Sequence, residues 1–136
     1  MFCRCRSTEG TATVEGVVSG PGLANVFEFF HTVEGAPLTA AEATIMELAR
    51  ADQPAAIAAA ALEGEPTAGA AVDLMLTAFG AELRQVALRC MPEGGVYIAG
   101  GIAPKLRERM GTLVTSFIEG DQLMQDLISS FPLYLV

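Results

Sequence analysis

The sequence is short of positive charge and of long apolar runs, and each shortage argues against a class of protein. Only 8 Lys and Arg residues stand against 16 Asp and Glu residues, which gives a formal net charge of −8 over 136 residues. Nucleic acids and anionic membrane surfaces are bound by basic faces, so neither is expected as a partner. No apolar run approaches the ~20 residues that span a bilayer. No apolar stretch follows the first charged residues, so no secretory signal peptide is expected.

Cysteine and histidine are also scarce. The three cysteines, Cys3, Cys5 and Cys90, are odd in number and too few for a disulfide framework. Together with the single histidine, His31, they lack the paired spacing of a zinc site, so we expect no metal site and free thiols in a reducing cytoplasm. Cys90 ends an apolar helical pattern and is expected to be a small core residue. His31 has no evident partner and is expected at the surface.

The residues that are present suit one packed domain. Apolar residues make up 51% of the chain and charged residues 18%, so disorder of the whole chain is not expected. Residues 1–13 are rich in Arg, Cys, Ser and Thr and follow no period, which predicts an unstructured or foreign leader. A shifted reading frame, an internal start or a gene remnant would explain such a leader. Residues 14–136 are assigned to the packed part.

Hydrophobic periodicity predicts a helix-rich α/β fold. Thr39 and Glu42 have the spacing of a capping box, in which side chain and backbone exchange hydrogen bonds at a helix start. The apolar runs at 95–99 and 131–136 predict two strands that are covered on both faces, as in a parallel sheet. The helices are expected at residues 23–30, 39–51, 52–62, 67–91, 104–109 and 121–128. In the first helix, Leu23, Val26, Phe27 and Phe30 are expected on one face, and in the helix at 67–91 Val86 is expected among the inward residues.

A glycine pair between the first strand and a short helix is one candidate site. Residues 96–104 read Val-Tyr-Ile-Ala-Gly-Gly-Ile-Ala-Pro, with the pair at Gly100 and Gly101. Missing Cβ atoms let a flat ligand or a phosphate approach the backbone, and a helix N-terminus at Pro104 would add partial positive charge. The alternative is a tight turn with no ligand. The basic segment at 105–109 is open to the same two interpretations, contact with phosphates or a solvated helix face.

A second candidate site is Glu15, a carboxylate inside an apolar segment. Residues 14–25 read Val-Glu-Gly-Val-Val-Ser-Gly-Pro-Gly-Leu-Ala-Asn. A carboxylate accepts hydrogen bonds from two neighbouring hydroxyls, which is a common way to hold a sugar or a ribose. The alternative is a solvated surface charge.

These two motifs together resemble the bacterial glucokinase family. The segment at 14–25 is similar to the family motif in which a short Glu-containing helix precedes Ser-Gly-Pro-Gly-Leu-x-Asn. Residues 94–104 are similar to the family's adenosine motif, and residues 131–136 to its following strand. All three occur in the family's order and at roughly its spacing, so the resemblance covers residues 14–136.

The resemblance implies a partial actin-like ATPase (ribonuclease H-like) domain, the carboxyl-terminal lobe of a glucokinase. In such an enzyme ATP, with Mg²⁺, donates its γ-phosphoryl group to the 6-hydroxyl of glucose, a step of glycolysis in the cytoplasm. By this resemblance Glu15 binds glucose, and Gly100, Gly101 and Ile102 lie against the nucleotide. Glucose and ATP are therefore the expected partners.

Other family motifs are not found in this sequence. They are the Asp-x-Gly-Gly-Thr-Asn phosphate loop, the Asn-Asp pair that contains the general base, and the Gly-Glu-Gly-Gly-His sugar motif. The chain is thus expected to be truncated at both ends, to contain no catalytic residue and to be inactive alone. Two alternatives stay open: a non-catalytic helical module that binds a partner or forms a homodimer through the apolar helix at 67–91, and a free-standing nucleotide-binding domain.

Overall fold

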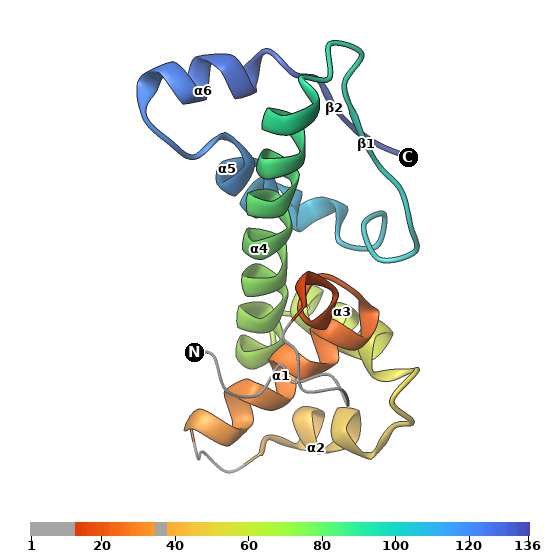
Figure 1. Ribbon diagram of the computed structural model, residues 1–136. Coiled ribbons are helices and arrows are strands. Elements are labelled where there is room, and N and C mark those ends of the chain that lie inside the picture. Colours follow the sequence, from red (N-terminus) through yellow and green to blue (C-terminus); the bar gives the residue numbers. More distant parts are fainter. Residues whose placement is uncertain (1–12, 35–37) are drawn as a thin grey trace. The chain divides into compact units, whose positions relative to one another are not determined.

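The computed structural model describes residues 13–34 and 38–136 (Figure 1). The chain divides into two compact units, residues 1–75 (unit 1) and 76–136 (unit 2). The elements in chain order are η1 (Val14–Gly16), α1 (Gly20–Glu34), α2 (Ala40–Glu47), α3 (Gln53–Leu62), α4 (Pro66–Cys90), β1 (Val96–Ile98), η2 (Arg107–Arg109), α5 (Met110–Ile118), α6 (Gln122–Ser129) and β2 (Leu133–Leu135). Helix α4 begins in unit 1 and ends in unit 2. Residues 35–37, which lie between two predicted helices, and the expected leader, apart from residue 13, lie outside the described residues.

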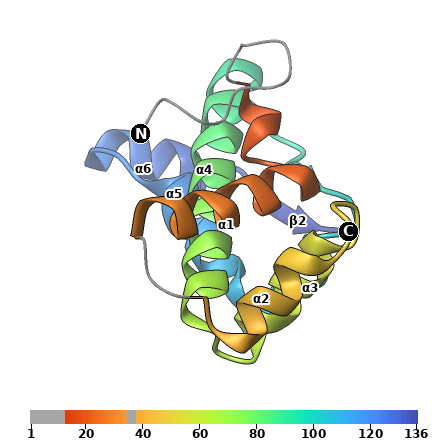
Figure 2. The same ribbon diagram turned by 90° about the horizontal axis from the view of Figure 1, so that it is seen from below.

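The core of unit 1 is built from the apolar faces of its helices. In α1, Leu23, Val26 and Phe27 are at most 3% exposed, as the i, i+3, i+4 spacing predicted, whereas Phe30 of the same predicted face is only partly buried. Helix α3 packs against both α1 and α2 and contributes the fully buried Ile57 (Figure 2). Each such side chain contributes about 1.5–3 kcal/mol by leaving water, so these contacts hold the unit together.

Helix α2 begins as the sequence predicted but ends earlier. The capping box is confirmed: the Thr39 hydroxyl accepts from the Glu42 N–H at 3.2 Å, and the Thr39 N–H donates to Glu42 Oε2 at 2.6 Å. The expected end near Ala51 is wrong, because α2 stops at Glu47 and Leu48 is extended. The Leu48 carbonyl instead accepts a hydrogen bond from the Gln53 side chain at 3.2 Å. A contact with a later helix therefore replaces the last turn of α2.

Unit 2 is organised by a close approach of α4 and α5. A Cβ at Gly80 would lie 2.3 Å from the Leu113 carbonyl oxygen, so only glycine fits there. Ser116 donates to the Thr77 carbonyl at 2.8 Å, and Arg84 Nη1 donates to the Ser116 carbonyl at 3.1 Å. One cluster of buried residues in this unit consists of Ala87, Phe117, Ile128 and Phe131.

The two strands pair in parallel, as predicted, with Val96 opposite Leu133. The expectation that both faces are covered is wrong. Tyr97 is 64% exposed and Tyr134 is 45% exposed, and their rings stack at 4.9 Å on that face. The opposite face carries Ile98, which is 3% exposed. The apolar run at 95–99 indicated a strand, but it did not show that one face lies open in this chain.

The segment between the strands differs most from the sequence prediction. No α-helix begins at Pro104, because residues 103–106 form turns and 107–109 form the single 3-10 turn η2. Helix α5 was not predicted at all. Its signal was present, since Met110, Leu113 and Phe117 follow the i, i+3, i+7 spacing of a buried helical face. Helix α6 is confirmed within one residue at its start and its end.

Two residues of α4 are more exposed than expected. The helix itself is confirmed, but Val86, expected inward, is 39% exposed. Cys90, expected in the core, is an exposed free thiol. It is the last residue of α4, and Met91 leaves the helix with a φ of 45°, so the thiol lies at the helix end. In the described part of the chain, no helix combines the length and the apolar character that crossing a membrane requires.

Candidate functional site

Glu15 lies in the exposed 3-10 turn η1, which precedes α1. Thr13 is extended and caps this turn, because its hydroxyl accepts from the Gly16 N–H at 3.2 Å. The Val17 and Val18 N–H groups donate to the Val14 carbonyl at 3.0 and 2.7 Å. The short Glu-containing helix that the family resemblance implied is thus present.

The Ser-Gly-Pro-Gly segment fixes this turn to the start of α1. The Ser19 hydroxyl donates to the Glu15 carbonyl at 2.6 Å and accepts from the Gly22 N–H at 2.9 Å. A Cβ at Gly22 would lie 2.5 Å from the carbonyl carbon and oxygen of Val17. The glycine therefore lets the backbone of α1 touch the backbone of the turn. These contacts explain why the motif has a hydroxyl residue at position 19 and glycine at position 22.

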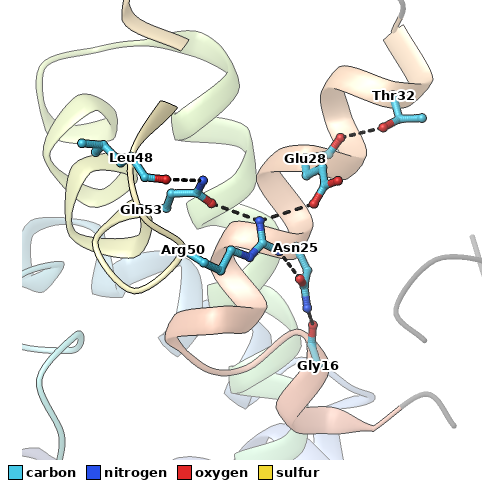
Figure 3. A network of polar contacts seen from close by, with 7 residues as sticks. All are labelled: Gly16, Asn25, Glu28, Thr32, Leu48, Arg50 and Gln53. Carbon is cyan, nitrogen blue, oxygen red and sulfur yellow. Dashed lines mark hydrogen bonds and ion pairs between the residues drawn. The ribbon is translucent and has the colours of Figure 1, made fainter. Parts of the chain in front are cut away.

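Asn25 contacts the turn directly, and Arg50 contacts Asn25 (Figure 3). The Asn25 side chain donates from Nδ2 to the Gly16 carbonyl at 3.2 Å, and its Oδ1 accepts from Arg50 Nη2. Arg50 Nη1 also donates to Glu28 Oε2 at 3.3 Å and to Gln53 Oε1 at 3.0 Å. Sequence analysis did not single out Arg50. The only signal was a cation near the end of the helix predicted over residues 39–51.

Gly100, Gly101 and Ile102 share one turn after β1. Gly100 has a φ of +131°, a conformation that other residues rarely adopt. Gly101 has no such φ, and a Cβ at either glycine would meet no atom of the described chain within 4 Å. The Ile102 carbonyl accepts from the Lys105 and Leu106 N–H groups at 3.0 and 3.2 Å. Hydrogen bonds therefore fix the segment after Ile102, whereas the backbone at Gly100 and Gly101 has free space where a Cβ would lie.

The sequence predicted that a helix N-terminus at Pro104 adds positive charge beside the glycine pair, and this prediction is wrong. Because no α-helix begins at Pro104, a helix dipole cannot add the positive charge expected there. The basic segment at 105–109 is likewise not an α-helix face, because residues 105 and 106 lie in turns and residues 107–109 form η2. Lys105 and Arg107 are exposed, whereas Leu106 between them is fully buried and anchors the segment.

His31 is not the isolated surface residue that was expected. Its side chain is only 14% exposed, and its ring meets Phe27 edge-on at 4.8 Å. Its Nε2 is buried without a hydrogen bond and lies 3.8 Å from Glu42 Oε1. Burial acts to raise the pKa of Glu42, but hydrogen bonds from Thr67 and Thr39 and the charge of His31 outweigh it, so the pKa is lowered.

The candidate residues are divided between the two units of the chain. Glu15 belongs to unit 1, and Gly100, Gly101 and Ile102 belong to unit 2. Within residues 13–34 and 38–136, no three His, Cys, Asp or Glu side chains are grouped so that they could hold a metal ion. We therefore assign no metal ligand to the described residues.

The chain matches known proteins along nearly its whole length. The family model described as Glucokinase matches residues 2–136, a range that includes most of the segment interpreted as a leader. A glucokinase from Synechocystis sp. is 36% identical over 139 residues, and one from Nostoc punctiforme is 34% identical over 137 residues. These matches cover 93% and 91% of the chain but 39% and 40% of the relatives.

A solved structure gives the same result for the fold. The crystal structure of a glucokinase from an Antarctic psychrotroph superposes with a TM-score of 0.72 at 25% sequence identity. The superposition covers 98% of this chain and 38% of that chain. The fold is thus that of part of a glucokinase, in agreement with the carboxyl-terminal lobe implied by the resemblance. Because the family model matches 135 consecutive positions, residues 2 to 136, the chain belongs to the glucokinase family.

Proposed function

We propose that this chain supplies part of the glucose site and part of the nucleotide site of an ATP-dependent glucokinase. In the intact enzyme the γ-phosphoryl group of ATP passes to the 6-hydroxyl of glucose, and glucose 6-phosphate enters glycolysis in the cytoplasm. The observation that carries the proposal is the family match over residues 2–136. The chain spans about 40% of the length of the curated relatives named above, so the activity is proposed for the whole protein.

Glu15 is the proposed sugar ligand. Its side chain is exposed, while its backbone is fixed by the Ser19 hydroxyl and by the hydrogen bonds of η1. A carboxylate on a fixed turn loses little conformational freedom when it binds, and its two oxygens can accept from two sugar hydroxyls at once. This combination of an exposed charge and a rigid backbone favours a binding role over a solvated surface charge.

Gly100, Gly101 and Ile102 are the proposed contacts of the nucleotide. Neither the backbone conformation nor a neighbouring atom of the described chain requires glycine at position 101. A backbone without a Cβ at this position lets a flat base or ribose lie against it. ATP would bring Mg²⁺ as its phosphate counter-ion, which offsets charge during phosphoryl transfer.

We propose that the chain is inactive alone. The sugar motif, the phosphate loop and the general base named for the family are not found in its sequence. A general base alone contributes about 10²–10⁴-fold to a rate, and loss of phosphate-binding donors lowers it further. A coupled assay for glucose 6-phosphate is expected to show no turnover above background. Turnover by protein free of contaminating kinases would contradict this prediction.

The test of the glucose site is a titration of the ¹⁵N-labelled chain with glucose. We expect weak binding, with shift changes centred on residues 13–19, and no response to sorbitol, an open-chain polyol of the same carbon number. Glu15→Gln removes the charge and is expected to weaken binding about 10- to 100-fold, the range for a lost charged hydrogen bond. Glucose shifts that Glu15→Gln leaves unchanged would contradict the assignment of Glu15.

The DNA flanking the reading frame provides an independent test. If it encodes the phosphate loop, the Asn-Asp pair and the sugar motif, the kinase proposal gains direct support. If it encodes none of them, the non-catalytic binding module becomes the better hypothesis. Sedimentation over a range of concentrations then decides whether that module forms a homodimer, and a monomer at all concentrations would contradict it.

A further inference from the structure

Arg50 is the centre of a polar network that joins three segments of unit 1. It lies in the connection between α2 and α3, and its guanidinium contacts Glu28 and Asn25 of α1 and Gln53 of α3 (Figure 3). Among these partners, only Asn25 also contacts the turn that carries Glu15.

The orientation of the two amides follows from the chemistry of Arg50. A guanidinium only donates hydrogen bonds, so the amide oxygens of Asn25 and Gln53 face it. Each amide nitrogen then points away from Arg50 and donates to a backbone carbonyl. Asn25 donates to Gly16 at 3.2 Å, and Gln53 donates to Leu48 at 3.2 Å. Three of the five guanidinium N–H groups and one N–H of each amide therefore meet an acceptor in this network.

The contact with Gly16 places this network next to the proposed sugar ligand. Gly16 directly follows Glu15, so the two peptide units on either side of Gly16 are held, one by Ser19 and one by Asn25. We propose that Arg50 is a positioning residue for Glu15: by fixing the Asn25 amide, it holds the turn in the conformation that presents the carboxylate. The inference rests on the proposed function, since it assumes that Glu15 binds glucose.

A simpler role for Arg50 would be its ion pair with Glu28. That pair is 3.3 Å long, and the two side chains are 45% and 54% exposed. Exposed ion pairs contribute little to stability because water screens them. If Arg50 acted only through this pair, Arg50→Met would leave the turn that carries Glu15 unaffected.

The first experiment needs no sugar and measures amide hydrogen exchange by NMR on the full chain. Arg50→Met removes the donors and is expected to speed exchange of the Val17 and Val18 amides about threefold to tenfold, as expected for a partly exposed charged contact. The side-chain NH₂ resonances of Asn25 should shift as well. Arg89→Met, an exposed arginine of α4 in unit 2, is the matched control and should change neither.

Two further variants identify the path of the effect. Glu28→Gln keeps an acceptor for Arg50 but removes the ion pair, and it should leave the exchange of Val17 and Val18 unchanged. Asn25→Leu removes the contact with Gly16 and should match Arg50→Met. Because Arg50 acts through Asn25, the double variant should equal Asn25→Leu alone. Additive effects, or an equal effect of Glu28→Gln, would overturn the proposal.

A glucose titration of the same variants completes the test. Arg50→Met should weaken glucose binding by a factor similar to the rise in exchange at the turn, whereas Arg89→Met should leave it unchanged. If the wild-type chain binds no glucose, the proposed function loses its support while the exchange data still decide whether Arg50 positions the turn. If exchange at the turn does not respond to Arg50→Met, the positioning role is wrong whatever the sugar result.

Discussion

The turn that carries Glu15 and the turn that carries Gly100 and Gly101 use glycine for opposite reasons. In the first, Gly22 allows two backbone segments to touch, and hydrogen bonds from Ser19 and Asn25 close the turn. In the second, both glycines face open space within the described chain. A fixed turn suits a side chain that must be presented precisely, and an open backbone suits a ligand that lies against it.

The largest expected difference between the two turns comes from Gly22→Ala. Its Cβ would lie 2.5 Å from the Val17 backbone, so α1 and η1 would have to separate. We expect a loss of about 3 kcal/mol, at the upper end for overpacking. Hydrogen exchange of the amides in unit 1 measures it. Gly111→Ala in α5 is the control and should be neutral or slightly stabilising, because its Cβ meets nothing within 4 Å. Equal losses of stability in Gly22→Ala and Gly111→Ala would contradict the role of Gly22 as a contact glycine.

In the turn of Gly100 and Gly101, only a substitution that strains the backbone should lower stability. Gly100→Ala forces alanine to a φ of +131° and is expected to lower the stability of unit 2 by about 1–2 kcal/mol. Gly101→Ala has neither strain nor a clash within the described chain and should stay within about 0.5 kcal/mol of wild type. Denaturant unfolding of both variants measures the difference. A large loss for Gly101→Ala would show that packing, rather than ligand approach, explains this glycine.

A smaller effect is expected at the capping box of α2. Thr39→Ala removes the oxygen that accepts from the Glu42 N–H and should cost about 1 kcal/mol. Exchange of the α2 amides should rise, and amides of unit 2 should not change. Thr39→Ser keeps the hydroxyl and should restore most of the loss. No rescue by serine would indicate that the methyl group, not the cap, matters.

The smallest expected effect is a dependence of unit 1 on acid pH. The pKa of Glu42 lies below its ordinary value of 4.5 in the folded chain, so the unfolded chain binds its proton first. This carboxylate therefore stabilises the fold above pH 4.5, and its contribution is lost as the pH falls through the lowered pKa. Unfolding of wild type and Glu42→Gln between neutral and acid pH measures it. If the stability of Glu42→Gln fell more steeply with acid than that of the wild type, the predicted direction of this effect would be wrong.

Much of the fold could be predicted from local sequence signals. The capping box at Thr39 and the apolar spacing of Leu23, Val26 and Phe27 located helices that the structure contains, because each signal depends on neighbouring residues, although α2 ends earlier than predicted. Helix α5 was missed although its periodic signal was present. The helix expected at Pro104 was wrong, because a proline followed by a fully buried Leu106 suits a turn as well as a helix start.

In the candidate site too, residues in local motifs could be predicted and contacts between distant segments could not. The resemblance identified Glu15 and the glycine pair, since those residues stand in continuous motifs. It did not identify Arg50, which is 25 residues from Asn25 in sequence. His31 and Glu42 were treated separately for the same reason, although their side chains are neighbours at 3.8 Å. Contacts between distant segments leave no local pattern.

The sequence by itself determined the helices with strong periodicity, the parallel strand pair and the family to which the chain belongs. These depend on local spacing and on motifs that are read directly along the chain. Only the tertiary structure decided that Arg50 reaches the turn of Glu15 through Asn25, that Gly22 is a contact glycine and that Gly101 is not. The physical reason is that packing brings together donors, acceptors and backbone atoms whose separation in sequence carries no information about their distance in space.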